Sequence, residues 1–297
     1  MANEPDQSMS ITQTIKNYFD VDSWSFLKPK YEKEDVVYGT SKIDQNAEVY
    51  NMNHKRRGTA LILNQIQFKK MSPRLGAKTD SANLEKILKD IGFDVKIYHD
   101  LNFKTIALTL EAIAEEDHTD ADCLVVVAMS HGESRYLHAT DSTYPVELLW
   151  STFIGNKCPS LAGKPKLFFI QACRGTRVDN GVQMYYETDA MATFSLPSYA
   201  DIMVAYSTYD GFYSFRNPDT GSWFIQALCQ ELSQHWRSRD LLGIMTSVVR
   251  RVAIDYQSFA PQNEEFHQKK QIPTIVSMLT RLVIFEEKGK TASTSKE

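Results

Sequence analysis

The chain has 297 residues, of which 42% are hydrophobic, and its formal net charge is −4. A chain with this charge has no overall basic field, which argues against nucleic acid or an anionic membrane surface as a partner. The N-terminus lacks a basic segment followed by an apolar stretch, and nowhere do 18 apolar residues run together. The sequence therefore predicts a soluble, cytoplasmic protein.

The four cysteines are widely spaced, and none belongs to a Cys-x-x-Cys pair: Cys123, Cys158, Cys173 and Cys229. In a reducing compartment this spacing argues against a disulfide framework and against a structural zinc site. His118 and His138 could join Cys123 around a metal ion, but their spacing fits no zinc pattern. We expect no metal and no cofactor.

Residues 1–49 are polar, with one short apolar pattern at helical spacing: Ile11, Ile15, Tyr18 and Phe19. A segment of this length is too short for a domain of its own. We interpret it as a removable or partly ordered leader before a single domain that begins at residue 50. The basic cluster at 55–57 is expected to be a solvated flank of the first strand rather than an import signal or a phosphate site.

The first half of the domain alternates apolar strands with amphipathic helices. Buried strands are expected at 59–64, 94–98 and 123–129. Asp80 is expected to cap the first helix. The apolar positions at helical spacing are Leu84, Ile87, Leu88 and Ile91 in that helix, and Ile106, Leu110 and Ile113 in the second. This alternation predicts a parallel sheet with right-handed crossovers.

The second half continues the pattern, with one long interruption. It predicts a short helix at 145–150, a strand that ends close to Cys173, a strand at 202–206, a loop at 209–221, helices at 222–236 and 240–257, and an apolar segment at 275–285. The connection 176–198 is polar and has little periodicity. Long loops inside compact domains usually carry function or are processed.

Two of the predicted strands end in residues that can do chemistry. His131 follows the strand at 123–129, and Cys173 follows the apolar run 167–170. Parallel strands present their carboxyl ends at one edge of a sheet, and an imidazole beside a thiol can generate a nucleophilic thiolate. The backbone amides of Gly132 and Cys173 could stabilise an oxyanion. The alternative is two ordinary strand-terminal residues, because a free cysteine is commonly buried and inert.

Two short motifs surround this pair: Cys173 lies in Gln-Ala-Cys-Arg-Gly and His131 lies in Ser-His-Gly-Glu. Both motifs resemble those of the caspases, and in particular the short-leader effector enzymes, with the insect type as a candidate. Further similar blocks lie at 50–55, 163–168, 213–217, 221–226, 269–273 and 277–280. The resemblance covers about residues 50–285. It implies a three-layer α/β/α fold with a central, mostly parallel six-stranded sheet and helices on both faces.

The resemblance also implies a cysteine endopeptidase that cleaves proteins after aspartate. Arg74 and Arg216 would clamp the aspartate carboxylate, with Gln171 as a neutral donor. Arginine suits this task because its planar fork matches a carboxylate. Arg174 would lie beneath the site as a structural residue. The remaining substrate contacts would come from Tyr213 and Phe215 for the residue before the aspartate, and from Asn217 and Trp223 for the fourth residue.

Processing sites are implied in the same way. Residues 186–189 read Tyr-Glu-Thr-Asp before Ala190, which is similar to the inter-subunit site of effector caspases. Cleavage after Asp189 would give a large subunit, 50–189, and a small subunit, 190–297. Asp179 is a second candidate in the connection, and Asp22, with Asp44 as runner-up, would release the leader.

The family also implies partners and a cellular role. The chain would be a zymogen that acts in apoptosis. It would form a homodimer, or a heterodimer with a paralogue, through residues 275–278. Its other partners would be an upstream initiator caspase and inhibitor-of-apoptosis proteins.

Three positions depart from the common effector pattern: Pro73, Ala77 and Phe215. Proline fixes φ and removes an amide donor beside Arg74. These departures leave open a rival hypothesis, in which the chain is a catalytically weakened regulator that pairs with an active paralogue. A third alternative is a cysteine hydrolase of another kind, and the paired arginines argue against it.

Overall fold

The computed structural model describes residues 46–155, 157–179 and 199–288. The predicted cleavage positions Asp22, Asp44 and Asp189 lie outside these ranges. Within the ranges, no helix has both the length and the apolar composition needed to cross a membrane.

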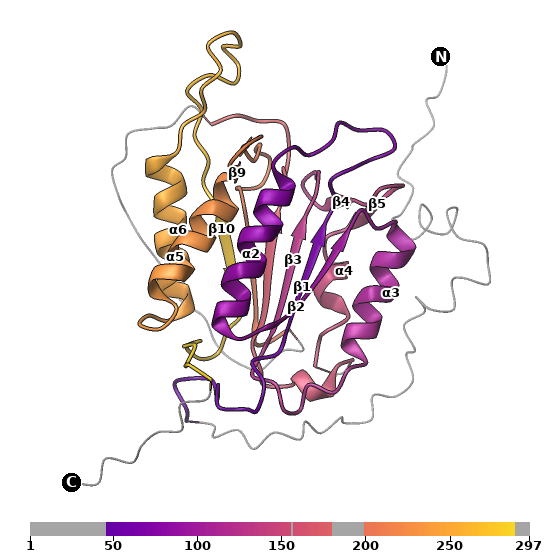
Figure 1. Ribbon diagram of the computed structural model, residues 1–297, viewed down its shortest axis with the longest axis vertical. Coiled ribbons are helices and arrows are strands. Elements are labelled where there is room, and N and C mark those ends of the chain that lie inside the picture. Colours follow the sequence, from indigo (N-terminus) through magenta and orange to yellow (C-terminus); the bar gives the residue numbers. More distant parts are fainter. Residues whose placement is uncertain (1–45, 156, 180–198, 289–297) are drawn as a thin grey trace, which may run out of the picture. The chain divides into compact units, whose positions relative to one another are not determined.

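A six-stranded sheet forms the centre of the described part (Figure 1). Its strand order is β10-β7-β6-β3-β1-β2. The bounds are β1 Thr59–Asn64, β2 Asp94–His99, β3 Leu124–Met129, β6 Lys166–Gln171, β7 Ile202–Tyr206 and β10 Thr274–Ser277. Only β10 runs antiparallel to its neighbour among these six strands. The predicted mostly parallel sheet is therefore confirmed.

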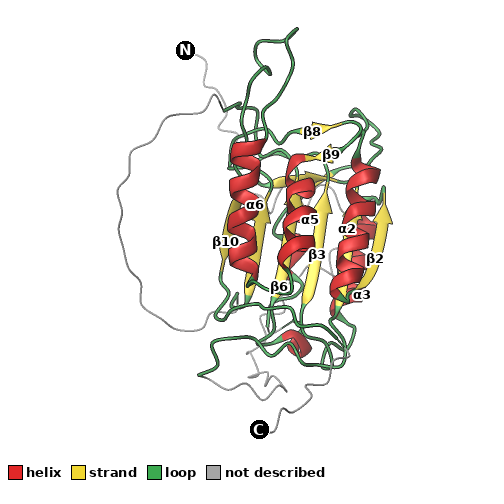
Figure 2. Ribbon diagram, turned by 60° about the vertical axis from the view of Figure 1, so that its left-hand side comes forward, coloured by secondary structure: helices red, strands yellow, loops and turns green. Residues whose placement is uncertain are grey.

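Helices cover both faces of this sheet. Figure 2 shows α2 (Ala77–Ile91), α5 (Trp223–His235) and α6 (Leu241–Asp255) side by side on one face. On the other face lie α3 (Phe103–Ala114) and the short α4 (Leu148–Ser151). Alternate residues of each inner strand face the two hydrophobic cores. This is why β1, β3 and β6 are buried along their whole length and apolar in their middle. The three-layer α/β/α architecture is confirmed.

Several short elements were not predicted. They are β4 (Tyr136–His138), β5 (Thr143–Pro145), the 3-10 turn Pro159–Leu161, β8 (Arg216–Asn217) and β9 (Gly221–Ser222). Pro145 ends β5, so the helix expected at 145–150 begins only at Leu148. The loop expected at 209–221 contains β8 and leads into β9, and these two strands form a hairpin that carries Arg216.

Helix α2 begins differently from the prediction. It starts at Ala77, and its N-cap residue is Gly76, at φ 79°, without a side-chain cap. Asp80 lies one turn inside the helix, where its carboxylate accepts hydrogen bonds from the backbone N–H and the hydroxyl of Ser222 at 2.8 and 2.6 Å. The predicted capping role of Asp80 is wrong, because its carboxylate is hydrogen-bonded to Ser222, which is distant in the sequence.

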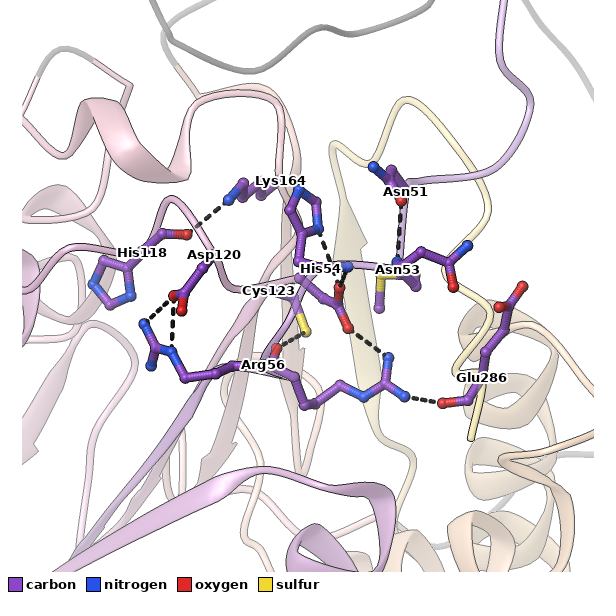
Figure 3. A network of polar contacts seen from close by, with 12 residues as sticks. Asn51, Asn53, His54, Arg56, His118, Asp120, Cys123, Lys164 and Glu286 are labelled. Carbon is purple, nitrogen blue, oxygen red and sulfur yellow. Dashed lines mark hydrogen bonds and ion pairs between the residues drawn. The ribbon is translucent and has the colours of Figure 1, made fainter. Parts of the chain in front are cut away.

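A buried ion cluster lies at the end of the sheet where β1 and β3 begin (Figure 3). The carboxylate of Asp122 is fully buried and pairs with Arg57 at 2.8 Å, His54 at 3.1 Å and Lys288 at 2.5 Å. Arg57 also donates to the carbonyl of Glu286. The cluster thus ties the start of the domain to the end of the described chain.

Asp122→Ala is expected to lower the free energy of unfolding by about 3–5 kcal/mol, because the buried guanidinium of Arg57 loses its counter-ion. Equilibrium urea denaturation measures the change. Asp120→Ala is the matched control: it breaks an exposed pair with Arg56 and should cost no more than about 1 kcal/mol. Equal losses in the two variants would contradict this account of the cluster.

Candidate active site

His131 and Cys173 lie beside each other because the strands that precede them are neighbours. Strands β3 and β6 are parallel, and their last residues, Met129 and Gln171, are paired. Each candidate residue follows its strand end by two positions. The turns are in close contact, since a Cβ atom on Gly132 would lie 2.8 Å from the carbonyl oxygen of Cys173. Only glycine fits at that position.

A backbone carbonyl orients the imidazole of His131. Its Nε2 atom lies 2.9 Å from the carbonyl oxygen of Ser72. A carbonyl can only accept, so Nε2 carries the proton and Nδ1 is left to act as a base. The ring also packs on Phe68, with the ring centroids 4.8 Å apart. Burial lowers the pKa of His131, the charges of Arg74 and Arg216 lower it further, and the bond to Ser72 opposes them.

The thiol of Cys173 is contacted by Ser214. The backbone N–H of Ser214 donates to Sγ at 3.4 Å, and Sγ lies 3.8 Å from the Ser214 carbonyl oxygen. Burial raises the pKa of Cys173, whereas the Ser214 N–H and the two arginines lower it. Burial thus acts against the charged form of both groups, the imidazolium and the thiolate.

Two backbone N–H groups remain free beside the thiol. The short bridge between Gly132 and Leu137 is closed by hydrogen bonds of the flanking residues, from Glu133 N to Tyr136 O and from His138 N to His131 O. The N–H of Gly132 takes no part in it. Within the described residues, neither this N–H nor that of Cys173 has an acceptor. Such a pair can receive the negative oxygen that forms in acyl transfer.

Arg74 is the most deeply buried cation near the thiol. Its Nη1 atom donates to the carbonyl of Gln65 at 2.8 Å and lies 3.4 Å from the side-chain oxygen of Asn64. Its Nε and Nη2 atoms are buried without an acceptor in the described part of the chain. Burial, first of all, and the charge of Arg216 lower the pKa of Arg74 to about 9, and Asp80 opposes this shift. These unpaired N–H donors favour the binding of an anionic ligand group.

Arg216 and Gln171 are the other two predicted contacts of the substrate carboxylate, and with Arg74 they make up the predicted pocket. Arg216 is on β8, and no described group accepts a hydrogen bond from its guanidinium. Burial lowers the pKa of Arg216, against the charges of Asp80 and Cys173. Gln171 donates one N–H to the hydroxyl of Ser214 at 2.9 Å. The site therefore holds two desolvated guanidinium groups that lack a directly bonded carboxylate.

Aromatic rings extend from this pocket. Phe215 stacks on Trp223 at 4.7 Å, and Trp223 stacks on Tyr256 at 5.4 Å. Tyr213 meets Phe266 edge to face at 5.1 Å. Asn217 accepts two backbone N–H groups through its side-chain oxygen, at 2.8 and 3.0 Å, and so shapes the turn of the β8–β9 hairpin. Tyr213 and Phe215 lie within three residues of Arg216 in the chain, and the five rings together are the apolar surface of the site.

The unusual Pro73 does not displace Arg74. The N–H of Arg74 donates to the carbonyl of Ile66 at 2.9 Å, and the Arg74 side chain is fully buried. A residue before proline is restricted to extended conformations, so Pro73 also limits the orientations open to the Ser72 carbonyl that holds His131. Ala77, the second departure, is buried, and its carbonyl accepts from Asn64.

Comparison with known proteins places this site in a family. The model of the Caspase domain matches residues 57–284. The chain is a caspase. Caspase drICE of Drosophila melanogaster is 46% identical over 252 residues, covering 82% of this chain and 74% of the relative. Caspase-1 of Spodoptera frugiperda is 47% identical over 251 residues, covering 83% and 84%. A crystal structure of that second enzyme has a TM-score of 0.79, with 45% identity over 84% of this chain and 100% of its own.

As a caspase, the chain is an aspartate-specific cysteine endopeptidase. The structure brings His131 and Cys173 together at one end of the sheet. Arg174 packs on β7, with its guanidinium 4.0 Å from the ring centroid of Tyr206. Sequence reasoning missed the carbonyl of Ser72, the ring of Phe68, and Ser214, Tyr256 and Phe266. Every residue has a backbone carbonyl, so the sequence does not show which one will act as an acceptor. Isolated aromatic or polar residues in loops form no periodic pattern, so they could not be predicted either.

Proposed function

We propose that this caspase is an effector enzyme, made as a zymogen, that cleaves proteins after aspartate with Cys173 as nucleophile and His131 as base. The observation that carries the assignment is the pair of arginines beside the thiol. Arg74 offers two buried donors without an acceptor, and Arg216 is half-buried without a partner among the described residues. A substrate carboxylate would pair with both, and a neutral side chain would leave them desolvated.

The proposed reaction uses the thiol, the imidazole and the two free backbone N–H groups. Nδ1 of His131 takes the thiol proton, and Sγ of Cys173 attacks the backbone carbonyl carbon of the substrate aspartate. The resulting oxyanion accepts hydrogen bonds from the N–H groups of Gly132 and Cys173. The imidazolium then gives its proton to the leaving amine, and a thioester remains on Cys173. Water, activated by the same imidazole, hydrolyses the thioester and restores the thiol.

For the substrate residues before the aspartate, we propose the apolar surface as the binding region. Tyr213 and Phe215 would contact the adjoining residue, and Asn217 with Trp223 would contact the fourth. Phe215 is already stacked on Trp223. The two subsites would therefore respond together to a substitution at either ring.

Activation is proposed to occur by cleavage after Asp189, with Asp179 as the second position and Asp22 or Asp44 as sites that release the leader. The two subunits would stay together after the cut, because β6 of the large subunit pairs with β7 of the small one along five residue pairs, from Lys166–Ile202 to Ile170–Tyr206. The backbone at Asp179 is held by a hydrogen bond, since its carbonyl accepts from the N–H of Lys270 at 3.0 Å. We therefore favour Asp189.

The cellular part of the proposal rests on the relatives. A caspase of effector type would act in apoptosis in the cytoplasm, after an initiator caspase has cut it and unless an inhibitor-of-apoptosis protein blocks it. Its dimer, of two copies or with a paralogue, would form through 275–278, where Val276 is 46% exposed on the edge strand β10. An unpaired edge strand is suited to pairing with a second chain.

Incubation of the purified chain tests the activation step. The wild-type chain is expected to convert into two fragments that meet after Asp189, and peptidase activity on acetyl-Asp-Glu-Val-Asp substrates should rise with the conversion. Asp189→Ala should remain intact at that position and keep low activity, and Asp179→Ala should convert normally. Full activity in an uncut chain, measured by gel and turnover together, would refute activation by cleavage.

A further inference from the structure

The β8–β9 hairpin that carries Arg216 is fastened to α2 by one buried carboxylate. Asp80 is fully buried, and its two oxygens accept hydrogen bonds from the N–H of Ser222 at 2.8 Å and from its hydroxyl at 2.6 Å. Ser222 lies directly opposite Arg216 in the hairpin. We propose that Asp80 is a positioning residue that fixes Arg216 for the substrate carboxylate. This inference rests on the proposed function, in which Arg216 binds that carboxylate.

The direction of the Ser222 N–H supports this role. In the hairpin, the N–H of the next residue, Trp223, donates to the carbonyl of Phe215 at 3.3 Å. The Ser222 N–H therefore points away from β8, and Asp80 satisfies it from the other side. Without Asp80 a buried donor would have no acceptor, which is costly.

The contact surface has no spare room. Gly221 has φ +98°, and a Cβ atom there would lie 2.2 Å from the nearer carboxylate oxygen of Asp80. Gly76, at φ +79°, meets the hairpin in the same way, since its Cβ atom would lie 2.6 Å from the carbonyl oxygen of Asn217. Two glycines in left-handed conformations thus let the hairpin lie directly on the beginning of α2. The backbones of the hairpin and of α2 are therefore already in close contact, and the hydrogen bonds of the Asp80 carboxylate hold them there.

Electrostatics adds a second link between Asp80 and the pocket. The charges of Arg74 and Arg216 act on Asp80, and its charge acts on both arginines. The two arginines would repel each other in a desolvated pocket, and Asp80 offsets part of that repulsion. Because the same carboxylate holds the hairpin, it keeps Arg216 near Arg74 when no substrate is bound.

The test compares peptide turnover with thiol reactivity in the full chain after activation. Asp80→Ala is expected to lower kcat/KM for acetyl-Asp-Glu-Val-Asp substrates by about 10²-fold, mostly through KM, since a small displacement of a binding group has effects of this size. Alkylation of Cys173 by iodoacetamide, followed by mass spectrometry, does not use the pocket and should stay near the wild-type rate. Asp80→Asn keeps one acceptor for the Ser222 N–H but loses the charge, so it should recover part of the loss. Glu85→Ala, on the exposed side of α2, is the matched control and should behave as wild type.

A second variant approaches the same contact from the hairpin. Gly221→Ala would press its Cβ atom against Asp80 and should raise KM as Asp80→Ala does, even if Asp80→Ala fails to fold. Unchanged KM in a folded Asp80→Ala or Gly221→Ala chain would overturn the positioning role, and so would an Asp80→Asn variant as impaired as Asp80→Ala. Wild-type chain that does not cleave the peptide would instead refute the proposed function.

Discussion

Cys173→Ala is expected to abolish peptidase activity, with kcat/KM for acetyl-Asp-Glu-Val-Asp substrates falling at least about 10⁴-fold. The reason is that the substitution removes the sulfur that we propose as the nucleophile while leaving the rest of the site in place. Sγ contacts Ser214 at 3.4 and 3.8 Å and fills no inner core position, so the fold should be retained. Turnover is measured with the fluorogenic peptide, and folding by thermal denaturation. The same variant should fail to cut itself after Asp189.

Cys229→Ala provides the matched control for the thiol. Cys229 lies on α5, and burial raises the pKa of its thiol to about 12, so it is a poor nucleophile at neutral pH. Its replacement should leave turnover per folded molecule unchanged. Retained self-cleavage in Cys173→Ala, together with loss of activity in Cys229→Ala, would show that the nucleophile is misassigned.

The second large effect is expected from Arg216, which we propose binds the carboxylate of the substrate aspartate. Arg216→Ala should lower kcat/KM by about 10²- to 10³-fold or more, because losing one partner of a buried ion pair costs about 3–5 kcal/mol. Arg74 would still offer its Nε and Nη2 donors, but the carboxylate would lose the contacts and the charge of the second guanidinium. Steady-state kinetics with the same peptide gives the value.

Two variants separate charge from geometry at this position. Arg216→Lys keeps a positive charge but loses the planar fork, so it should lie between wild type and Arg216→Ala. Arg250→Ala removes an exposed arginine from α6, away from the pocket, and should have no effect. If Arg216→Ala turns over the peptide at the wild-type kcat/KM, Arg216 does not contact the substrate carboxylate.

Much of the fold was readable from the sequence because burial imposes periodicity. The helices expected at 222–236 and 240–257 are observed at Trp223–His235 and Leu241–Asp255, and the strand expected at 59–64 has those bounds. These segments are long, and each presents an apolar stripe or an apolar run to a core. The β8–β9 hairpin has two residues in each strand, which is too few to show any period.

Asp80 shows why part of the site could not be predicted. An acidic residue just before an apolar helical pattern is usually an N-cap, and local statistics contain no sign of Ser222. In the structure Gly76 takes the cap position in a left-handed conformation, and the carboxylate is free to bind the hairpin. Tertiary partners of this kind become visible only when the chain is folded.

The proposed catalytic pair is the opposite case. His131 and Cys173 follow two neighbouring parallel strands whose apolar runs are evident in the sequence, so their proximity could be deduced before any coordinates. What could not be deduced is how they are oriented. The Ser72 carbonyl fixes the imidazole, and the Ser214 N–H faces the sulfur. Both are backbone groups, which carry no residue-specific signal.

The most direct test of the account compares two peptides that differ only in the first residue before the cut, aspartate against asparagine. The side chains are nearly equal in size, so the ratio of their kcat/KM values reports the charge that Arg74 and Arg216 recognise. We predict a preference for aspartate of about 10³-fold or more, as expected when buried charges are left unpaired. Equal kcat/KM values for the two peptides would contradict the account, because the buried guanidinium groups would then have no part in choosing the substrate.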